Sequence, residues 1–255
     1  MYYIIQENLF KEEEWNNLIR SLERLQLEYE IVELIPFVDD ITFTTNRKDV
    51  FVFGALKMAR ITPKYQWNPG VIMTPNHDFN VYKNYYKDNL LNYDSKIFKF
   101  NDEWNWNNEE YFIRPTLDTK VFTGKPFDKE EWIKFREYSL NNGHTTTLNE
   151  DTLIQVSTVK NIQKEFRFFI VNGKIVTGSL YKNGYFINYS DIIDDDAVDF
   201  CKDMLNIFQL APAFVMDICL TNNKWKIIEC GCINCAGFYK ANIMSLLIAL
   251  EDNFN

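Results

Sequence analysis

The sequence predicts an α+β protein, and three observations lead to this fold class. Helical and strand patterns alternate in residues 1–95, as is typical of a small α/β unit. Further along, apolar runs occur as two pairs joined by short polar turns, which indicates two β-hairpins. With 255 residues, of which 46% are apolar, the chain can bury a substantial core without disulfide bonds.

The N-terminal unit shows a helical pattern early. Its apolar side chains recur at i, i+3, i+4, i+7 and i+10 from Trp15. The segment DEWNWNNEE (102–110) has no periodicity and is the best candidate for a linker. The elements expected before it are a strand at 2–5, a helix at 12–25, an apolar run at 29–36, and a strand reaching Gly54 that turns into a helix.

The middle of the chain predicts a second unit. Pro115 should end its first strand, because proline lacks a backbone N–H, and Asp128 is a suitable N-cap for its helix. The expected elements are a strand at 110–115, a loop at 116–127, a helix at 129–140 and a strand at 153–157.

The last third predicts two hairpins and two helices. The dipeptide Asn172-Gly173 favours a tight turn between the first two strands. The expected elements are a hairpin at 165–181, a helix at 197–208, a second hairpin at 213–231 and a closing helix over 233–252.

Composition excludes several classes of function. The 27 basic and 36 acidic residues give a net charge of −9, which argues against binding nucleic acid through its phosphates. No apolar run approaches the length of a membrane span, and the start lacks the features of a signal peptide, so we expect a cytoplasmic protein. Five cysteines are then expected as free thiols, because a structural zinc site normally requires four ligands and only Cys230, Cys232 and Cys235 cluster.

The sequence carries no signature of a serine or cysteine hydrolase. His77 and His144 are its two histidines, and both lie among polar turn residues where we expect them to be exposed. The phosphate loops GxxxxGK(S/T) and GxGxxG are also absent.

A set of basic side chains in the middle unit is a candidate polyphosphate clamp. Arg114 ends a strand, Lys120 and Lys125 lie on the loop that follows, and Gly124 would allow close backbone approach. A guanidinium offers a fixed fork of donors and ammonium groups offer mobile charges. The alternative is a solvated basic hairpin.

Two carboxylates in the second hairpin form the acidic counterpart. Asp217 and Glu229 follow apolar runs on strands that pair antiparallel, so they can lie close together, with Asn234 nearby. Hard oxygen ligands of this kind suit Mg²⁺. Burying both carboxylates without a cation would cost on the order of several kcal/mol, which a metal ion would offset. Two carboxylates in water at the rim are the alternative.

Two further positions are candidates for lining a cleft. Glu165 and Arg167 alternate with phenylalanines on a strand, so they share one face, which is either solvated or faces a cleft. Gln155 and Val156 precede the change of pattern, where a chain crossing between lobes would offer free backbone groups to a base such as adenine.

Taken together, the motifs resemble those of a known family. The ordered runs YFIRPTLDTKVFTGKPF, LIQVS, KEFRFFIVNGKIVTGSLY and FVMDICL…KWKIIECGCINCAGFY resemble ATP-grasp ligases, in particular the bacterial and phage clade named for one arginine and two lysines. The resemblance implies an ATP-grasp fold, in which two α+β lobes hold ATP, preceded by a small α/β domain. The implied domains are residues 1–95, 96–157 (small lobe) and 158–255 (large lobe).

The resemblance also implies roles for the candidate residues. Many relatives carry Glu-x-Asn at the last pair of metal ligands, whereas Gly231 holds the asparagine position here, and Asn234 is the expected substitute. The implied ATP-binding residues are Arg114, Lys120, Lys125, Gln155, Val156, Glu165 and Arg167. The implied catalytic residues are Arg114, Lys125 and Arg167, and the implied Mg²⁺ ligands are Asp217, Glu229 and Asn234.

The implied activity is ATP-dependent joining of a carboxylate to an amine through an acylphosphate. The partners would be ATP, Mg²⁺, and a carboxylate and an amine belonging to a small molecule, a peptide or a protein. A kinase-like phosphotransferase, a non-catalytic nucleotide-binding module and a structural interaction protein are the alternatives. The sequence leaves open which substrates are used and whether the chain forms a homo-oligomer.

Overall fold

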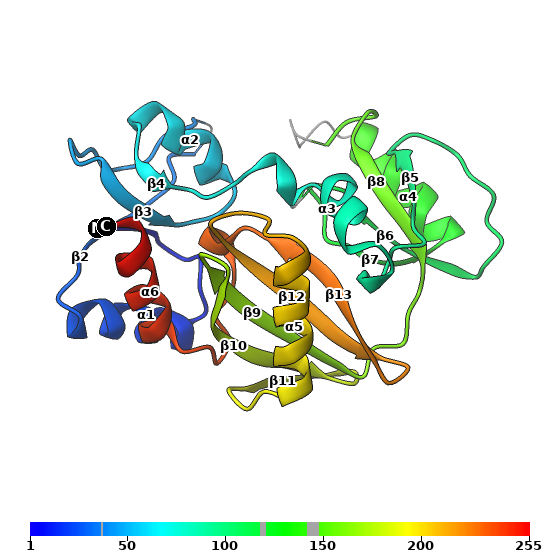
Figure 1. Ribbon diagram of the computed structural model, residues 1–255. Coiled ribbons are helices and arrows are strands. Elements are labelled where there is room, and N and C mark those ends of the chain that lie inside the picture. The colour runs from blue at the N-terminus through cyan, green and yellow to red at the C-terminus, as the bar shows by residue number, and fades with distance from the viewer. Residues whose placement is uncertain (37, 118–120, 142–147) are drawn as a thin grey trace.

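A computed structural model describes residues 1–36, 38–117, 121–141 and 148–255. These residues form three β-sheets with helices packed on them, which confirms the predicted α+β class (Figure 1). Among the described residues, no helix combines the length and apolarity that a membrane crossing requires.

The N-terminal sheet is parallel and has the strand order β2-β1-β3-β4. Its two helices connect successive strands, as the alternating pattern predicts. The elements are β1 (Tyr2–Gln6), α1 (Glu12–Arg24), β2 (Glu28–Val32), β3 (Asp49–Phe53), α2 (Lys57–Tyr65) and β4 (Asn68–Gly70).

A helical segment leads from this sheet to the second one. It consists of the 3₁₀ helix η1 (Pro75–His77), α3 (Phe79–Tyr86) and the 3₁₀ helix η2 (Lys87–Asn89). The expectation that His77 is exposed is wrong, because its side chain is buried and its ring nitrogen contacts Thr74. His144 lies outside the described residues.

The second sheet is antiparallel and has the strand order β5-β8-β6-β7. This sheet and the helix α4 together are called the small lobe. Asp128 caps α4 as predicted, since its Oδ1 accepts a hydrogen bond of 2.8 Å from the backbone N–H of Glu131. The elements are β5 (Lys96–Lys99), β6 (Glu110–Pro115), β7 (Lys125–Asp128), α4 (Lys129–Asn141) and β8 (Leu153–Thr158).

The acidic, tryptophan-rich segment 102–110 is not a linker between units. The strand β5 precedes it and pairs with β8, so the segment is a loop within the small lobe. Trp104 stacks on Phe98 and on Trp106, with ring centroids 5.0 and 5.5 Å apart. Aromatic packing therefore holds this segment in place despite its polar composition.

The third sheet is antiparallel and has the strand order β11-β10-β9-β12-β13. This sheet and the helices α5 and α6 together are called the large lobe. Asn172 and Gly173 both have positive φ angles, 48° and 71°, which confirms the predicted tight turn. The elements are β9 (Lys164–Val171), β10 (Lys174–Asn183), β11 (Phe186–Ser190), α5 (Asp195–Ile207), β12 (Ala213–Thr221), β13 (Lys224–Gly231), the 3₁₀ helix η3 (Ile233–Cys235) and α6 (Ile243–Phe254).

The closing helix starts later than predicted, at Ile243 rather than 233. Asn242 caps it, since its side chain accepts a hydrogen bond of 3.0 Å from the backbone N–H of Ser245. Before that cap, Tyr239 has a φ angle of 55°, which is incompatible with a helix. The residues between η3 and α6 are therefore an irregular loop, and this loop contacts the candidate site.

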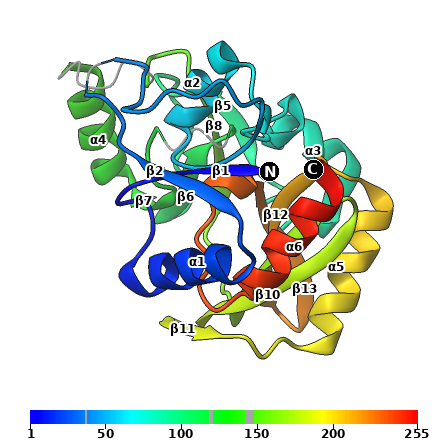
Figure 2. The ribbon, with the colours of Figure 1, turned by 90° about the vertical axis from the view of Figure 1, so that its left-hand side faces the viewer.

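Two of the three sheets share one hydrophobic core. Tyr3 and Phe53 of the N-terminal sheet pack in the same buried cluster as Phe169 and Phe214 of the large lobe. The small lobe has a separate core around Trp132. Figures 1 and 2 show the N-terminal sheet against the large lobe, with α1 and α6 side by side. An ion pair of 2.9 Å between the N-terminal ammonium group and the carboxylate of Glu251 joins the two ends of the chain.

Asn234 joins the N-terminal sheet to the large lobe. The side chain is fully buried, and its amide donates to the carbonyl oxygens of Val52 and Gly70 at 2.6 and 3.1 Å. Its Oδ1 accepts from the backbone N–H of Ile72 at 2.8 Å. The expectation that Asn234 completes a metal site is therefore corrected, because its amide group is occupied by backbone groups of another domain.

We predict that Asn234→Ala acts on stability. It leaves two carbonyl groups and one N–H group buried without their partner, so the free energy of unfolding should fall by about 2–4 kcal/mol. Urea unfolding measures this change. The exposed Asn253→Ala is the control and should cost less than about 0.5 kcal/mol. Unchanged stability combined with loss of Mg²⁺ binding would restore Asn234 as a metal ligand.

Candidate functional site

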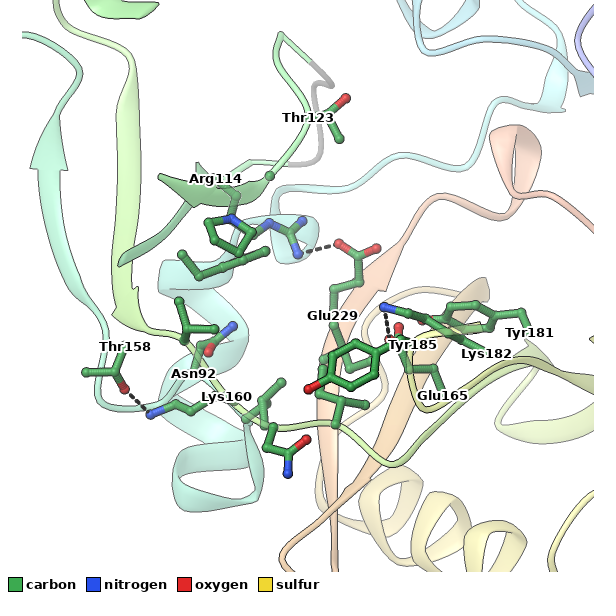
Figure 3. A pocket seen from close by; sticks show the side chains of 18 of the residues that line it. Asn92, Arg114, Thr123, Thr158, Lys160, Glu165, Tyr181, Lys182, Tyr185 and Glu229 are labelled. Carbon is green, nitrogen blue, oxygen red and sulfur yellow. Dashed lines mark hydrogen bonds and ion pairs between the residues drawn. The ribbon is translucent and has the colours of Figure 1, made fainter. Parts of the chain in front are cut away.

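The candidate site is a cavity of about 860 Å³ between the small and large lobes. That volume is typical of pockets for small molecules. The small lobe and the hinge supply one wall and the strands β9, β10 and β13 supply the other (Figure 3). The polar residues that line it are Asn92, Arg114, Thr123, Thr158, Lys160, Asn161, Glu165, Tyr181, Lys182, Tyr185 and Glu229.

Four charged side chains lie in one row that reaches this cavity. In the paired strands, Arg167 of β9 is opposite Asp217 of β12, and Asp217 is opposite Glu229 of β13. Directly paired residues project from the same face of a sheet. Arg114 of the small lobe reaches across the cavity and forms an ion pair with Glu229 (Figure 3). Two carboxylates are thus flanked by two guanidinium groups.

The pair at the inner end of the row is almost completely buried. The Nε and Nη2 atoms of Arg167 donate to the two oxygens of Asp217 at 2.8 and 2.7 Å. Burial raises the pKa of Asp217, while Arg167 opposes this shift. Burial also lowers the pKa of Arg167, but the attraction of Asp217 is stronger than this effect. The guanidinium pKa is therefore raised well above its ordinary value. The two parallel hydrogen bonds are the geometry of a guanidinium–carboxylate ion pair.

Glu165 lines the cavity together with Glu229. Like Arg167 it projects from β9 away from Phe166 and Phe168, which are buried in the core. On this charged face, Glu165 lines the cavity and Arg167 lies beside Asp217. The ammonium group of Lys182 lies 2.9 Å from its Oε1.

Each carboxylate of the site is thus neutralised by a basic side chain of the chain itself. The sequence argument held that a metal ion would offset the cost of burying two carboxylates; in the structure Arg167 and Arg114 provide positive charge beside them.

The acidic pair nevertheless fits Mg²⁺. Asp217 and Glu229 are neighbours on one face of the sheet and offer hard oxygen ligands. Among the described residues no group of three or more His, Cys, Asp or Glu side chains could hold a metal ion. Two carboxylates suffice for Mg²⁺, which usually binds one or two of them together with substrate phosphates and water.

Of the two lysines of the proposed clamp, the structure describes Lys125, which does not join this row. Lys125 pairs with Ile113 across β6 and β7, so it projects from the face of the small lobe opposite to Arg114. Its ammonium group lies 4.5 Å from the ring centre of Phe127. This placement does not support Lys125 as a phosphate ligand. Lys120 lies outside the described residues.

The hinge between the lobes begins later than Gln155 and Val156. Both residues lie in the middle of β8, whose neighbours β5 and β6 pair with their backbone on either side. Val156 also packs in the core of the small lobe. The residues of this crossing that line the cavity are instead 158–162, from the end of β8 toward β9. Within it, Lys160 binds Thr158 and Asp94, at 2.7 and 2.8 Å.

The cysteine cluster has a packing role. All five cysteines are free, as predicted, and all are buried. The thiol of Cys232 contacts the carbonyl oxygen of Ile72, and burial raises the pKa of Cys230 well above its ordinary value.

Sequence reasoning missed the tyrosines and lysines around the arginines. Tyr181 and Tyr239 lie with their rings near the guanidinium carbon of Arg167, at 5.9 and 5.0 Å, and Lys182 and Lys160 line the cavity. The alternation on β10 places Tyr181 in a strand, but only the strand register shows that it faces Arg167.

Comparisons with known proteins agree with this architecture. The structure of the ATP-grasp ligase PsnB in complex with a minimal precursor has a TM-score of 0.58 and 11% identity, covering 99% of this chain and 98% of that one. The D-alanine–D-alanine ligase of Bacillus anthracis in complex with ATP has a TM-score of 0.61 and 12% identity, covering 99% and 96%. That of Coxiella burnetii has a TM-score of 0.62 and 11% identity, covering 99% and 95%.

At these identities the likeness shows the fold alone, which is the ATP-grasp fold that the sequence motifs imply. A comparison with curated protein sequences gives no match. A family model matches residues 52–250, and it describes the ATP-grasp domain of family 3 in the clade named for one arginine and two lysines. The chain therefore belongs to this ATP-grasp family.

Proposed function

We propose that this protein is an ATP-dependent carboxylate–amine ligase that forms an amide bond through an acylphosphate. One observation carries the proposal: a cavity between the two lobes in which Arg114 from one side meets Glu229 from the other, with Arg167 and Asp217 in the same row. Opposite charges on facing lobes are what a magnesium-bound triphosphate requires, since its phosphates need cations and its metal needs oxygen ligands.

The proposed reaction has two steps. A substrate carboxylate oxygen attacks the γ-phosphorus of ATP, the bond from that phosphorus to the bridging oxygen breaks, and ADP leaves. The amine nitrogen then attacks the acyl carbon, loses a proton and expels phosphate, which leaves an amide. Most of the catalysis in such a phosphoryl transfer is positioning and neutralisation of charge.

The side chains of the site suit these tasks. Arg167 has five N–H donors, of which three are used by Asp217 and by the carbonyl oxygen of Gly237. Among the described residues its other two have no hydrogen-bond partner, and in the proposal they stabilise the transferring phosphoryl group. Arg114 neutralises the phosphates from the small lobe. Asp217 and Glu229 would hold Mg²⁺, which offsets phosphate charge when it is bound.

The hinge side of the cavity is the proposed place of the nucleoside. Residues 158–162 and Glu165 line the cavity, so in the proposal backbone groups of this stretch bind the base and the carboxylate binds the ribose. The proposed position of the base thus moves from Gln155 and Val156 to the hinge.

The substrates are proposed by class. Structures of similar fold include a ligase bound to a precursor, ligases of D-alanine and an L-amino acid ligase from Bacillus licheniformis. An amino acid, a peptide or a protein is therefore the proposed source of the carboxylate and of the amine.

The direct test measures ADP release with panels of amino acids and short peptides. The proposal expects ADP release that requires both a carboxylate and an amine, and a product whose mass is their sum minus one water. A stable phosphorylated product formed without amine would instead indicate a kinase. Failure of the protein to bind Mg·ATP would overturn the proposal.

Arg167→Ala should lower kcat by about 10²–10³-fold, because it removes donors aimed at the charge of the transition state. Binding of ADP in EDTA, which does not depend on the metal ligand Asp217, should change by less than about threefold when measured by calorimetry, and this also shows that the variant is folded. Arg167→Lys keeps one positive charge, so its kcat should lie between that of the wild type and that of Arg167→Ala. Turnover equal to that of the wild type in Arg167→Ala would remove Arg167 from the mechanism.

Glu229→Gln should weaken the contribution of Mg²⁺ to nucleotide binding. Glutamine keeps an oxygen that can accept from Arg114 but loses the negative charge that favours the metal ion. The ratio of ADP affinities measured with Mg²⁺ and with EDTA should fall by about tenfold or more. Glu130→Gln, at an exposed position on α4, is the control and should leave the ratio unchanged. Equal ratios in the two variants would argue against Glu229 as a metal ligand.

A further inference from the structure

One buried carboxylate close to the site belongs to the N-terminal domain. Glu14 lies in the first turn of α1 and is 8% exposed. Its Oε1 accepts a hydrogen bond of 2.5 Å from the backbone N–H of Tyr239 in the large lobe, and its Oε2 accepts one of 3.4 Å from the backbone N–H of Lys11. Glu14 precedes residues 52–250, so the part of the chain that the family model matches does not include it.

The residue that Glu14 binds has an unusual backbone. Tyr239 has a φ angle of 55°, a left-handed conformation that bulky residues rarely adopt and that persists only where the surroundings impose it. Besides Glu14, Ser179 holds the same stretch, because its Oγ accepts from the backbone N–H of Lys240 at 3.2 Å. The ring of Tyr239 stacks on the rings of Tyr181 and Tyr189, with centroid distances of 5.0 Å to each.

This loop contacts Arg167 at two points. The guanidinium carbon of Arg167 lies 5.0 Å from the ring centre of Tyr239, a distance at which a cation is attracted to an aromatic face. Its Nη1 donates to the carbonyl oxygen of Gly237 at 3.3 Å. A methyl group on Gly237 would lie 3.4 Å from Oε1 of Glu14, so the carboxylate packs against both residues that contact the arginine.

We propose that Glu14 is a positioning residue: by holding the loop 237–239, it orients the two N–H groups of Arg167 that Asp217 and Gly237 leave unused toward the γ-phosphoryl end of the cavity. The inference rests on the proposed function, in which Arg167 stabilises the transferring phosphoryl group. It assigns the N-terminal domain a part in the chemistry through a contact to the large lobe.

The test compares two nucleotides that differ at the γ-position. Calorimetry gives the dissociation constants of the β,γ-imido analogue of ATP and of ADP, both with Mg²⁺, for the wild type and the variants. In Glu14→Ala the analogue should bind about tenfold more weakly, while ADP changes by less than about threefold. Glu14→Gln keeps an oxygen that accepts from Tyr239 and should retain most of the preference for the analogue.

The neighbouring residue supplies a matched control. Glu13 lies in the same helical turn, but it forms an exposed ion pair with the side chain of Lys240 and does not bind the backbone of the loop. Glu13→Ala should therefore leave both dissociation constants unchanged. Thermal unfolding of each variant shows whether a change in binding follows from a loss of folded protein.

A second variant tests the loop if Glu14→Ala does not fold. Tyr239→Asn removes the ring, and asparagine tolerates the left-handed backbone of this position. The variant should lose affinity for the ATP analogue and not for ADP, as Glu14→Ala should. The inference would be overturned if Tyr239→Asn kept the wild-type preference for the analogue over ADP. It would also be overturned if Glu14→Ala weakened the binding of both nucleotides equally. Wild-type protein that binds neither nucleotide would instead overturn the proposed function.

Discussion

The pairing of Arg167 with Asp217 is the constraint on which the rest of the site depends. A carboxylate that is 2% exposed in the middle of a five-stranded sheet is stable as an ion only with a bidentate partner at 2.7–2.8 Å. The register of β9 and β12 brings the two side chains together, and a slip of one residue would turn Asp217 into the hydrophobic core. The phenylalanines that alternate with Arg167 oppose such a slip, because they are buried on the other face.

The same register determines how the small lobe meets the large one. Glu229 follows Asp217 in the row, and its partner Arg114 comes from a strand in a separate hydrophobic core. The chain crosses between the lobes at residues 158–162, so the two cores are joined there by a short backbone stretch and across the cavity by an ion pair. In the proposed function Arg114 binds phosphate, so its ion pair with Glu229 is exchanged when the nucleotide enters.

The sequence was sufficient where a pattern is local. Alternation on β9 predicted that Glu165 and Arg167 share a face, and turn residues such as Asn172-Gly173 predicted the hairpin that carries them. The sequence did not predict the side of a sheet from which a residue projects where the pairing of distant strands determines it. Lys125 and Arg114 are both basic and close in sequence, but the pairing of Lys125 with Ile113 turns it away from the cavity. Asn234 was misassigned for a related reason, since its partners lie more than 160 residues away.

The N-terminal domain contacts the large lobe through a shared core and through buried hydrogen bonds. Tyr3 and Phe53 share a core with the large lobe, Asn234 binds the backbone of β3 and β4, and Glu14 binds the loop before α6. A domain held in this way cannot drift relative to Arg167, so a single carboxylate on it can hold the loop that touches the arginine. The small lobe has its own core instead, which makes it suited to admitting and releasing a ligand. The N-terminal domain and the large lobe thus share one core on one side of the cavity, and the small lobe on the other side has a separate core.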